Sequence, residues 1–312
     1  MNGPRPERSG SPPAGLPPGM LRARLTADGR LSHGGAAPAP GPEGAGAPVP
    51  WWSLTKTFIA VLTLRAAAAG RLGLDTPLPE RAVTPRQLLG HRAGLPDYGG
   101  WPEYAAAVAS GAPPWSDAAL LARMPPPAPA PAPFAYSNIG FLVLRRHLET
   151  VEGQGLGALL AGLLGPLGLT ARLAETPQDM RTTAFPGGWA CHPGWVFHGT
   201  LIGPVAEAAL ALGALFDGRL LGPEALAALR CARPLEQAAP PPWLAPGYAL
   251  GLMSGTLDTG AGPCRVEGHG GAGPGSTLAA FRFPSGTIAV CAAAEAPGVT
   301  LRAACALAGA SA

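Results

Sequence analysis

The sequence predicts a mixed α/β (α+β) fold in which an antiparallel sheet is flanked by helices and an all-helical lobe is inserted. Strand-like segments occur near the start of the chain, helical segments fill its middle, and strand-like segments return after residue 245. Such a change of period is typical of helices packed on an antiparallel sheet. We therefore expect an α/β lobe from residues 21–75 and 245–312, a helical lobe from residues 76–244, and a disordered, proline-rich tail over residues 1–20.

The first part of the chain predicts a hairpin and then a long helix. Asp28-Gly29 separates two short alternating segments, which is a hairpin signal. Ser53 stands at the expected N-cap of the segment LTKTFIAVLTLRAAAAG, and Gly70 is in position to end that helix. Apolar residues recur at helical spacing in this segment, so we expect most of the helix to be buried.

Four short strands are expected after residue 245, in the segments GYALGLMSG, CRVEGHGG, STLAAFRFP and TIAVCAAAE. Ser285-Gly286 marks a tight turn between the last two strands. The segment VTLRAACALAGA then predicts a closing helix. These strands and the N-terminal hairpin would together supply the sheet.

The composition argues against several classes of function. The chain has 312 residues, 47% of them apolar and only 13% charged, so it can bury a large core. The net charge is +3 and the arginines are scattered, which argues against nucleic-acid binding. The N-terminal segment lacks the apolar stretch of a secretory signal, and no run of about 18 apolar residues is free of charge or proline. We therefore expect no membrane span.

Cysteine usage and glycine spacing give no sign of a metal or a cofactor. The five cysteines form no C-x-x-C pair, which indicates small apolar residues in a reducing, cytoplasmic setting. Cys191 and His192 are adjacent, but no second pair has metal-binding spacing. Gly268, Gly270 and Gly273 match a dinucleotide-binding pattern, yet a strand follows them and no βαβ unit surrounds them. We expect neither metal nor cofactor.

Lys56 is the only lysine of the chain, and all other basic side chains apart from histidine are arginine. Arginine stays protonated in proteins, whereas burial or a nearby positive potential can remove the proton of a lysine. Ser53 lies three residues earlier, so both side chains share one face at a helix start, where the dipole favours a neutral amine. The pair predicts a base-activated nucleophile; the alternative is a leftover surface charge.

Two further motifs carry polar side chains. The segment FAYSNIGF contains Tyr136 and Asn138, and Asn138 is the only asparagine outside the N-terminal tail. The alternatives are a helix N-cap for Asn138 and a packed aromatic for Tyr136. In VEGHGGAGPGS, His269 ends an expected strand, and Gly270 and Gly271 would let a substrate backbone approach closely.

Ser-x-x-Lys, Tyr-x-Asn and His-x-Gly, in this order, resemble the motifs of the penicillin-recognising serine hydrolases. That superfamily includes class C β-lactamases, D-Ala-D-Ala carboxypeptidases and β-lactamase-like esterases. The segments GRLGLDTPL, TPRQLLGHRAGLPDY, PFAYSNIGFLVL and LFDGRLLGPEALAAL are also similar to the class C branch. The resemblance covers roughly residues 24 to 295 and implies a β-lactamase/transpeptidase-like fold.

The resemblance implies a role for each matching residue. Ser53 would attack a carbonyl carbon and form an acyl-enzyme, while Lys56 would take the hydroxyl proton. Tyr136 would hydrogen-bond to both and relay protons to the leaving group. Asn138 would contact the acyl side chain and Lys56.

The resemblance also implies which groups meet the substrate. His269, Gly270 and Gly271 would line the substrate-facing strand. The backbone N–H groups of Ser53 and Ala272 would form the oxyanion hole, in which each donor is worth roughly 3 kcal/mol.

Two departures from the superfamily's pattern bear on the substrate. True β-lactamases have a lysine where this chain has His269, so a fixed cation for a β-lactam carboxylate is missing. Trp51 and Trp52 stand where small residues are common, and would crowd the site, form an acyl pocket or pack in the core. The expected substrate is thus a small ester, amide or short D-peptide, with weak or no β-lactamase activity.

Two functions from different classes stay open on the sequence. The first is a serine hydrolase, and the second is a non-catalytic relative that keeps the cleft as a binding site. The titratable Ser-Lys-Tyr set favours the hydrolase, because binding alone needs no base. His91, His192 and His198 are interpreted as loop or packing residues. The sequence does not give the oligomeric state.

Overall fold

Strand β11 (Ile288–Ala293) is buried on both faces and organises the core. Its alternate residues belong to two different apolar clusters, with Ile288, Val290 and Ala292 in one and Ala289, Cys291 and Ala293 in the other. Since side chains alternate across a strand, the two clusters lie on opposite faces of one sheet. The sheet therefore separates two apolar layers.

The computed structural model describes residues 16–36, 46–126 and 128–309. The strands are β1 (Leu21–Leu25), β2 (Leu31–Gly34), β3 (Val49–Pro50), β4 (Arg172–Leu173), β5 (Leu201–Gly203), β6 (Arg233–Pro234), β7 (Trp243–Tyr248), β8 (Met253–Asp258), β9 (Pro263–Gly273), β10 (Ser276–Arg282) and β11. The α-helices are α1 (Thr55–Ala68), α2 (Pro85–Leu89), α3 (Pro102–Ala109), α4 (Asp117–Ala122), α5 (Asn138–Glu152), α6 (Leu156–Leu164), α7 (Pro177–Arg181), α8 (Val205–Phe216), α9 (Pro223–Arg230) and α10 (Pro297–Ala308).

The described strands form one large antiparallel sheet in the order β2-β1-β11-β10-β9-β8-β7-β6, and a small sheet in the order β3-β5-β4. Strand β1 pairs with β11, so the N-terminal hairpin joins the C-terminal strands, as expected. Gly29 and Gly286 occupy the two predicted turns with φ of +83° and +80°, a region that glycine adopts without strain. The expected class of helices on an antiparallel sheet is confirmed, but the inserted part, residues 76–244, is not all-helical, because β4, β5 and β6 lie within it.

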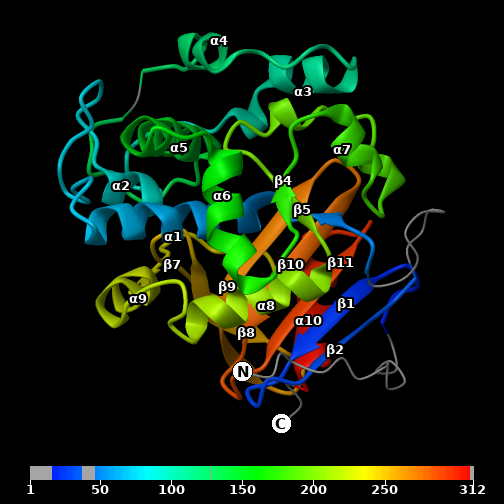
Figure 1. Ribbon diagram of the computed structural model, residues 1–312. Helices are drawn as coiled ribbons and strands as arrows, with labels where there is room; N and C mark the ends of the chain where they lie inside the picture. Colours follow the sequence, from blue (N-terminus) through cyan, green and yellow to red (C-terminus); the bar gives the residue numbers. More distant parts are fainter. Residues whose placement is uncertain (1–15, 37–45, 127, 310–312) are drawn as a thin grey trace.

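Helices cover both faces of the large sheet. Helix α10 packs on β10 and β11 from one side, while α8 packs on β1 and β11 from the other. Figure 1 shows α2, α3, α4 and α5 gathered at one end of the molecule. Helix α8 lies inside the range expected for the helical lobe, yet it belongs to the layers of the sheet. An apolar period locates a helix but does not say which surface the helix covers.

The tail was expected to extend to residue 20, but residues before that boundary already pack against the rest of the protein. Residues 1–15 lie outside the described residues. Met20 is 1% exposed and shares a cluster with the partly buried Leu16, so the chain already packs under the sheet before β1 begins. In the described part of the chain, no helix combines the length and apolar character needed to cross a membrane.

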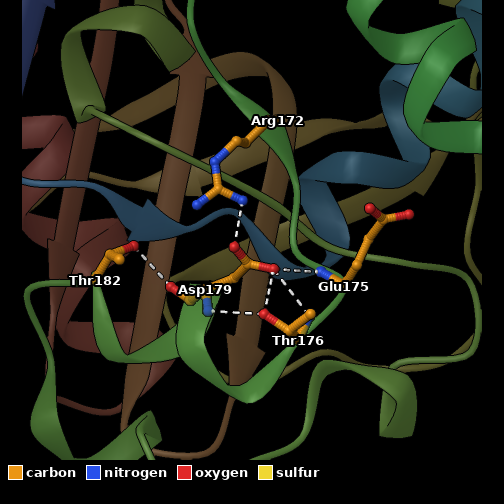
Figure 2. Close-up of polar contacts among 5 residues, drawn as sticks. All are labelled: Arg172, Glu175, Thr176, Asp179 and Thr182. Atoms are coloured by element: carbon orange, nitrogen blue, oxygen red, sulfur yellow. Dashed lines mark hydrogen bonds and ion pairs between the residues drawn. The ribbon is translucent and has the colours of Figure 1, made fainter.

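A carboxylate fixes the segment that joins β4 to α7 (Figure 2). Asp179 Oδ2 accepts hydrogen bonds from the backbone N–H groups of Glu175, at 2.9 Å, and Thr176, at 2.8 Å. Thr176 and Asp179 form a capping box at the start of α7, and Arg172 donates to Asp179 Oδ1 at 2.5 Å. Burial alone raises the pKa of Asp179, but these donors outweigh it and lower the pKa to about 2.

We expect Asp179→Asn to lower the free energy of unfolding by about 1–2 kcal/mol at neutral pH, because charged acceptors bind these donors more strongly than an amide. The pKa of Asp179 is lowered on folding, so its charge stabilises the fold above the usual carboxyl pKa of 3.8 and loses that effect as the pH falls towards 2. Urea denaturation at about pH 7 and about pH 3 measures the difference.

The control for this prediction is Asp217→Asn, at the exposed C-cap of α8, which should change stability by less than about 0.5 kcal/mol. An effect of Asp179→Asn that is equally large at both pH values would contradict the role of its charge.

Candidate active site

The turn before α1 places Ser53 beside Lys56 without using Ser53 as a helix cap. A 3-10 turn over Trp52–Leu54 precedes α1, and the first residue of α1 is Thr55. The expected N-cap role of Ser53 is therefore wrong, since the N-cap of α1 is Leu54 and no side chain caps it. The Ser53 hydroxyl instead points to two other polar groups.

The side chains of Ser53, Lys56, Tyr136 and Asn138 meet at one point. Lys56 Nζ lies 3.1 Å from Ser53 Oγ and 2.7 Å from Asn138 Oδ1. Tyr136 Oη donates to Ser53 Oγ at 2.8 Å. Lys56 Nζ lies over the Tyr136 ring, 5.1 Å from its centroid. The hydrogen bond from Tyr136 thus goes to the serine, and the lysine faces the ring.

The start of α5 explains how Asn138 is free to reach Lys56. Ser137 is the N-cap of this helix, and its Oγ accepts a hydrogen bond from Gly140 N–H at 2.9 Å. The N-cap interpretation of Asn138 is therefore wrong. The backbone N–H of Asn138 donates to Asp97 Oδ1 at 2.7 Å, which anchors the helix start to the preceding loop.

Burial sets the charge state of the two titratable groups. Lys56 is fully buried, and this desolvation holds its pKa well below the usual 10.5, although the nearby Asp97 opposes the shift. Burial likewise raises the pKa of Tyr136, against the effect of its hydrogen bond to Ser53. Burial therefore favours an uncharged amine and a protonated phenol beside the serine hydroxyl, an arrangement suited to proton transfer from that hydroxyl.

The two tryptophans before Ser53 pack in the core, which was one of the three expectations for them. Trp51 and Trp52 are 0% and 2% exposed. Trp52 has a φ of +45°, a strained value for a bulky residue. Its backbone N–H donates to Thr200 Oγ1 at 2.9 Å and its Nε1 to Ser276 Oγ at 3.0 Å, which hold this conformation.

The edge of β9 runs past the serine. Gly270 N–H donates to Met253 Sδ at 3.4 Å, on the side away from β10. Ala272 follows two residues later, so its N–H faces the same open edge. A Cβ at Gly271 would lie 2.6 Å from Trp51 O and 3.2 Å from Ser53 N. Gly271 has no side chain, and this allows the turn that carries Ser53, rather than a substrate, to approach β9 at this point.

His269 departs from its expected place against the substrate. The ring is 2% exposed, and Nδ1 donates to the carbonyl of Gly270. Nε2 must then accept from Tyr248 Oη at 3.0 Å, and Tyr248 in turn accepts from His91 Nε2 at 3.2 Å. Ser137 N–H donates to His91 Nδ1 and closes the chain. Both nitrogens of His269 are committed inside the protein, and burial lowers its pKa to about 3.

His198 is a member of the cluster that the sequence did not reveal. It is 3% exposed, and its Nε2 lies 2.9 Å from Lys56 Nζ. No motif or spacing marks it, and it was interpreted with His192 as a loop or packing residue. His192 does have a local role, since its Nδ1 accepts from Gly194 N–H at 3.0 Å.

The fold and the assembled residues define a serine hydrolase of the penicillin-recognising superfamily, as the sequence motifs predicted. The chain belongs to the Beta-lactamase family, whose family model matches residues 18–311. No curated protein sequence matches the chain significantly.

Solved structures with this fold include enzymes and a penicillin-binding protein. A D-stereospecific amidohydrolase from Streptomyces sp. is 24% identical with a TM-score of 0.72, covering 95% of each chain. A D-amino acid amidase from Ochrobactrum anthropi SV3, complexed with L-phenylalanine, is 21% identical with a TM-score of 0.75, covering 93% of this chain and 92% of that one. A penicillin binding protein from Bacillus halodurans is 19% identical with a TM-score of 0.70, covering 93% and 95%.

We expect Gly271→Ala to destabilise the protein by about 1–3 kcal/mol, because its methyl group would overlap backbone atoms of the serine turn. Thermal or urea unfolding measures the change. The matched control is Gly270→Ala in the same strand, whose Cβ would meet nothing closer than 3.8 Å and which should cost less than about 1 kcal/mol. Equal stability of the two variants would contradict the close packing of β9 on the serine turn.

We expect the amine of Lys56 to titrate well below its usual pKa of 10.5, because the folded protein buries it. Lys56 is the only lysine, so ¹³C-lysine labelling gives one side-chain signal whose chemical shift reports the titration directly. A Lys56→Arg sample, which lacks the signal, confirms the assignment. A midpoint near 10.5 in the folded protein would contradict the neutral amine.

Proposed function

We propose that the chain hydrolyses small esters and amides through an acyl-enzyme formed on Ser53. The observation that carries the proposal is the buried amine of Lys56, 3.1 Å from the Ser53 hydroxyl. A charged lysine would be a poor base, whereas a desolvated one can accept the hydroxyl proton near neutral pH. The arginines of this chain cannot replace it, since a guanidinium keeps its proton.

In the acylation step, Ser53 Oγ attacks the carbonyl carbon while its proton passes to Lys56 Nζ. The carbonyl π electrons move to the oxygen, and the resulting oxyanion accepts hydrogen bonds from the N–H groups of Ser53 and Ala272. When the bond to the leaving group breaks, that group takes its electron pair and a proton from Tyr136 Oη. The proton held by Lys56 then restores the phenol, and the cation beneath the ring stabilises the phenolate meanwhile.

In the deacylation step, the same groups act on a water molecule. The water loses a proton to the phenol–amine pair, and its oxygen forms a bond to the ester carbon. The bond from that carbon to Ser53 Oγ breaks, Ser53 regains a proton from Lys56, and the product acid leaves. Asn138 holds Lys56 through both steps, and the resemblance to the superfamily adds a contact between Asn138 and the acyl group.

The substrate proposed is one without a carboxylate beside the scissile bond. The position on β9 that faces the substrate in lysine-containing relatives here carries a buried, neutral imidazole, His269. Of the three residues expected to face the substrate, Gly270 is partly exposed at the open edge of β9, whereas His269 and Gly271 are buried. The names of the D-stereospecific amidohydrolase and the D-amino acid amidase add amides of D-amino acids to the proposed substrates.

A fluorophosphonate probe tests the nucleophile. We expect labelling of the native protein and none of Ser53→Ala, because the probe needs an activated serine. Lys56→Arg should lose at least about 10²-fold in labelling rate, since general-base assistance is worth that much. Absence of labelling in well-folded native protein would instead support a non-catalytic binding function.

A substrate series tests the chemical class. We expect the protein to hydrolyse p-nitrophenyl butyrate and D-phenylalanine amide much faster than a chromogenic cephalosporin, because β9 has no lysine to bind the cephalosporin carboxylate. The same assays on Ser53→Ala give the background. The reverse ranking would contradict the interpretation of His269.

A further inference from the structure

His198 is held in a loop that is tied to the serine turn at several points. Next to it, Thr200 Oγ1 accepts from the N–H of Trp52 at 2.9 Å, and the N–H of Leu201 donates to Thr55 Oγ1 at 2.9 Å. On the other side, the carbonyl of Phe197 accepts from Arg145 Nη1 at 2.8 Å. The imidazole therefore has little freedom relative to α1.

The contacts of Lys56 Nζ match the bonding of an uncharged amine. Such an amine has two N–H donors and one lone pair. Asn138 Oδ1, at 2.7 Å, is an acceptor and takes one N–H. Both ring nitrogens of His198 lie near the amine, Nε2 at 2.9 Å and Nδ1 at 3.4 Å, and the nearer Nε2 takes the other N–H when the imidazole carries its proton on Nδ1. The lone pair is then left for the remaining neighbour, Ser53 Oγ–H, at 3.1 Å.

The same contacts serve the protonated state. After the serine proton arrives, the ammonium has three N–H donors, and two of them already have acceptors in Asn138 and His198. The third points back to the oxygen of Ser53. A neutral imidazole thus accepts from Lys56 in both states of the base, so it needs no rearrangement during proton transfer.

The surroundings keep that imidazole uncharged. Burial, followed by the positive charge of Lys56 when protonated, holds the pKa of His198 well below its usual 6.5. The other titratable or charged groups that act on this pair are Asp97, which favours the lysine cation, and Arg145, His91 and His269, which disfavour a histidine cation. An acceptor nitrogen is therefore available across the neutral pH range.

We propose that His198 is a positioning residue that directs the lone pair of Lys56 to the Ser53 hydroxyl. The assignment rests on the proposed function of Ser53 and Lys56 and adds to it the group that orients the base. Without His198 the amine keeps one fixed acceptor and can rotate, so the lone pair spends little time on the serine.

Three variants separate this role from a packing role. His198→Leu removes the acceptor, His198→Gln can place an amide oxygen where Nε2 lies, and His147→Leu changes a histidine on the outer part of α5 as a control. We expect kcat/KM for p-nitrophenyl butyrate to fall about 10²-fold in His198→Leu, mainly in kcat, because His198 orients the base without touching the substrate. His198→Gln should recover most of the loss, and His147→Leu should match the native protein.

The single-lysine NMR signal gives a readout that needs no turnover. Loss of the His198 acceptor leaves the buried ammonium less stabilised, so we expect the pKa of Lys56 to fall further in His198→Leu. In His198→Gln and His147→Leu it should stay at the native value. A merely structural role would lower the melting temperature without moving this pKa.

The outcomes decide between failure of this assignment and failure of the proposed function. Native turnover or an unchanged Lys56 pKa in folded His198→Leu would overturn the positioning role while leaving the hydrolase intact. A loss of turnover that His198→Gln does not recover would overturn it as well. No turnover and no Ser53 labelling in the native protein would instead overturn the hydrolase itself.

Discussion

The site depends on one constraint, which is that the amine of Lys56 is kept out of water. The folded protein lowers the pKa of this group, so the unfolded chain takes up a proton that the folded chain does not. At neutral pH Lys56 therefore costs the fold stability, and the cost fades only as the pH rises towards 10.5. The core around α1 offsets that cost, because most residues of this helix are buried. Part of the stability that this core supplies is thus used to keep the Lys56 amine buried.

The neighbouring segments hold the Lys56 amine and the Ser53 hydroxyl in their relative positions. Trp52 holds a strained φ of +45°, a conformation that costs roughly 1–3 kcal/mol and persists only where contacts over-determine it. Its indole contacts the β9–β10 hairpin through Ser276 and shares a cluster with Met180 of α7. The capping network around Asp179 fixes α7, so a polar network at the surface supports the packing beside the nucleophile (Figure 2).

The sequence predicted the mixed architecture, and it singled out Ser53 and the three residues that gather at it, but not how their partners are arranged. Hairpins, strands and motifs can be predicted because turn residues, apolar periodicity and residue spacing are local features of the sequence. The contact between Lys56 and His198 joins residues 142 positions apart, and no spacing rule reaches that far. The inward bonding of His269 has the same cause, because it depends on Tyr248 and His91 from two other segments. The layer to which α8 belongs likewise depends on tertiary packing, which the apolar period of the helix does not reveal.

The series of hydrogen bonds that runs from Ser137 through His91 and Tyr248 to His269 allows only one arrangement of protons. A backbone N–H can only donate and a carbonyl can only accept, so the two ends fix the tautomers of both histidines and the direction of the tyrosine hydroxyl. Each ring nitrogen in the chain is then used, and a proton added to either histidine would break a hydrogen bond in a buried place. The chain therefore resists charging and links the start of α5, which carries Asn138, to the strand beside Ser53. At this point of β9 the protein therefore has a neutral and rigid hydrogen-bonded connection rather than a cation.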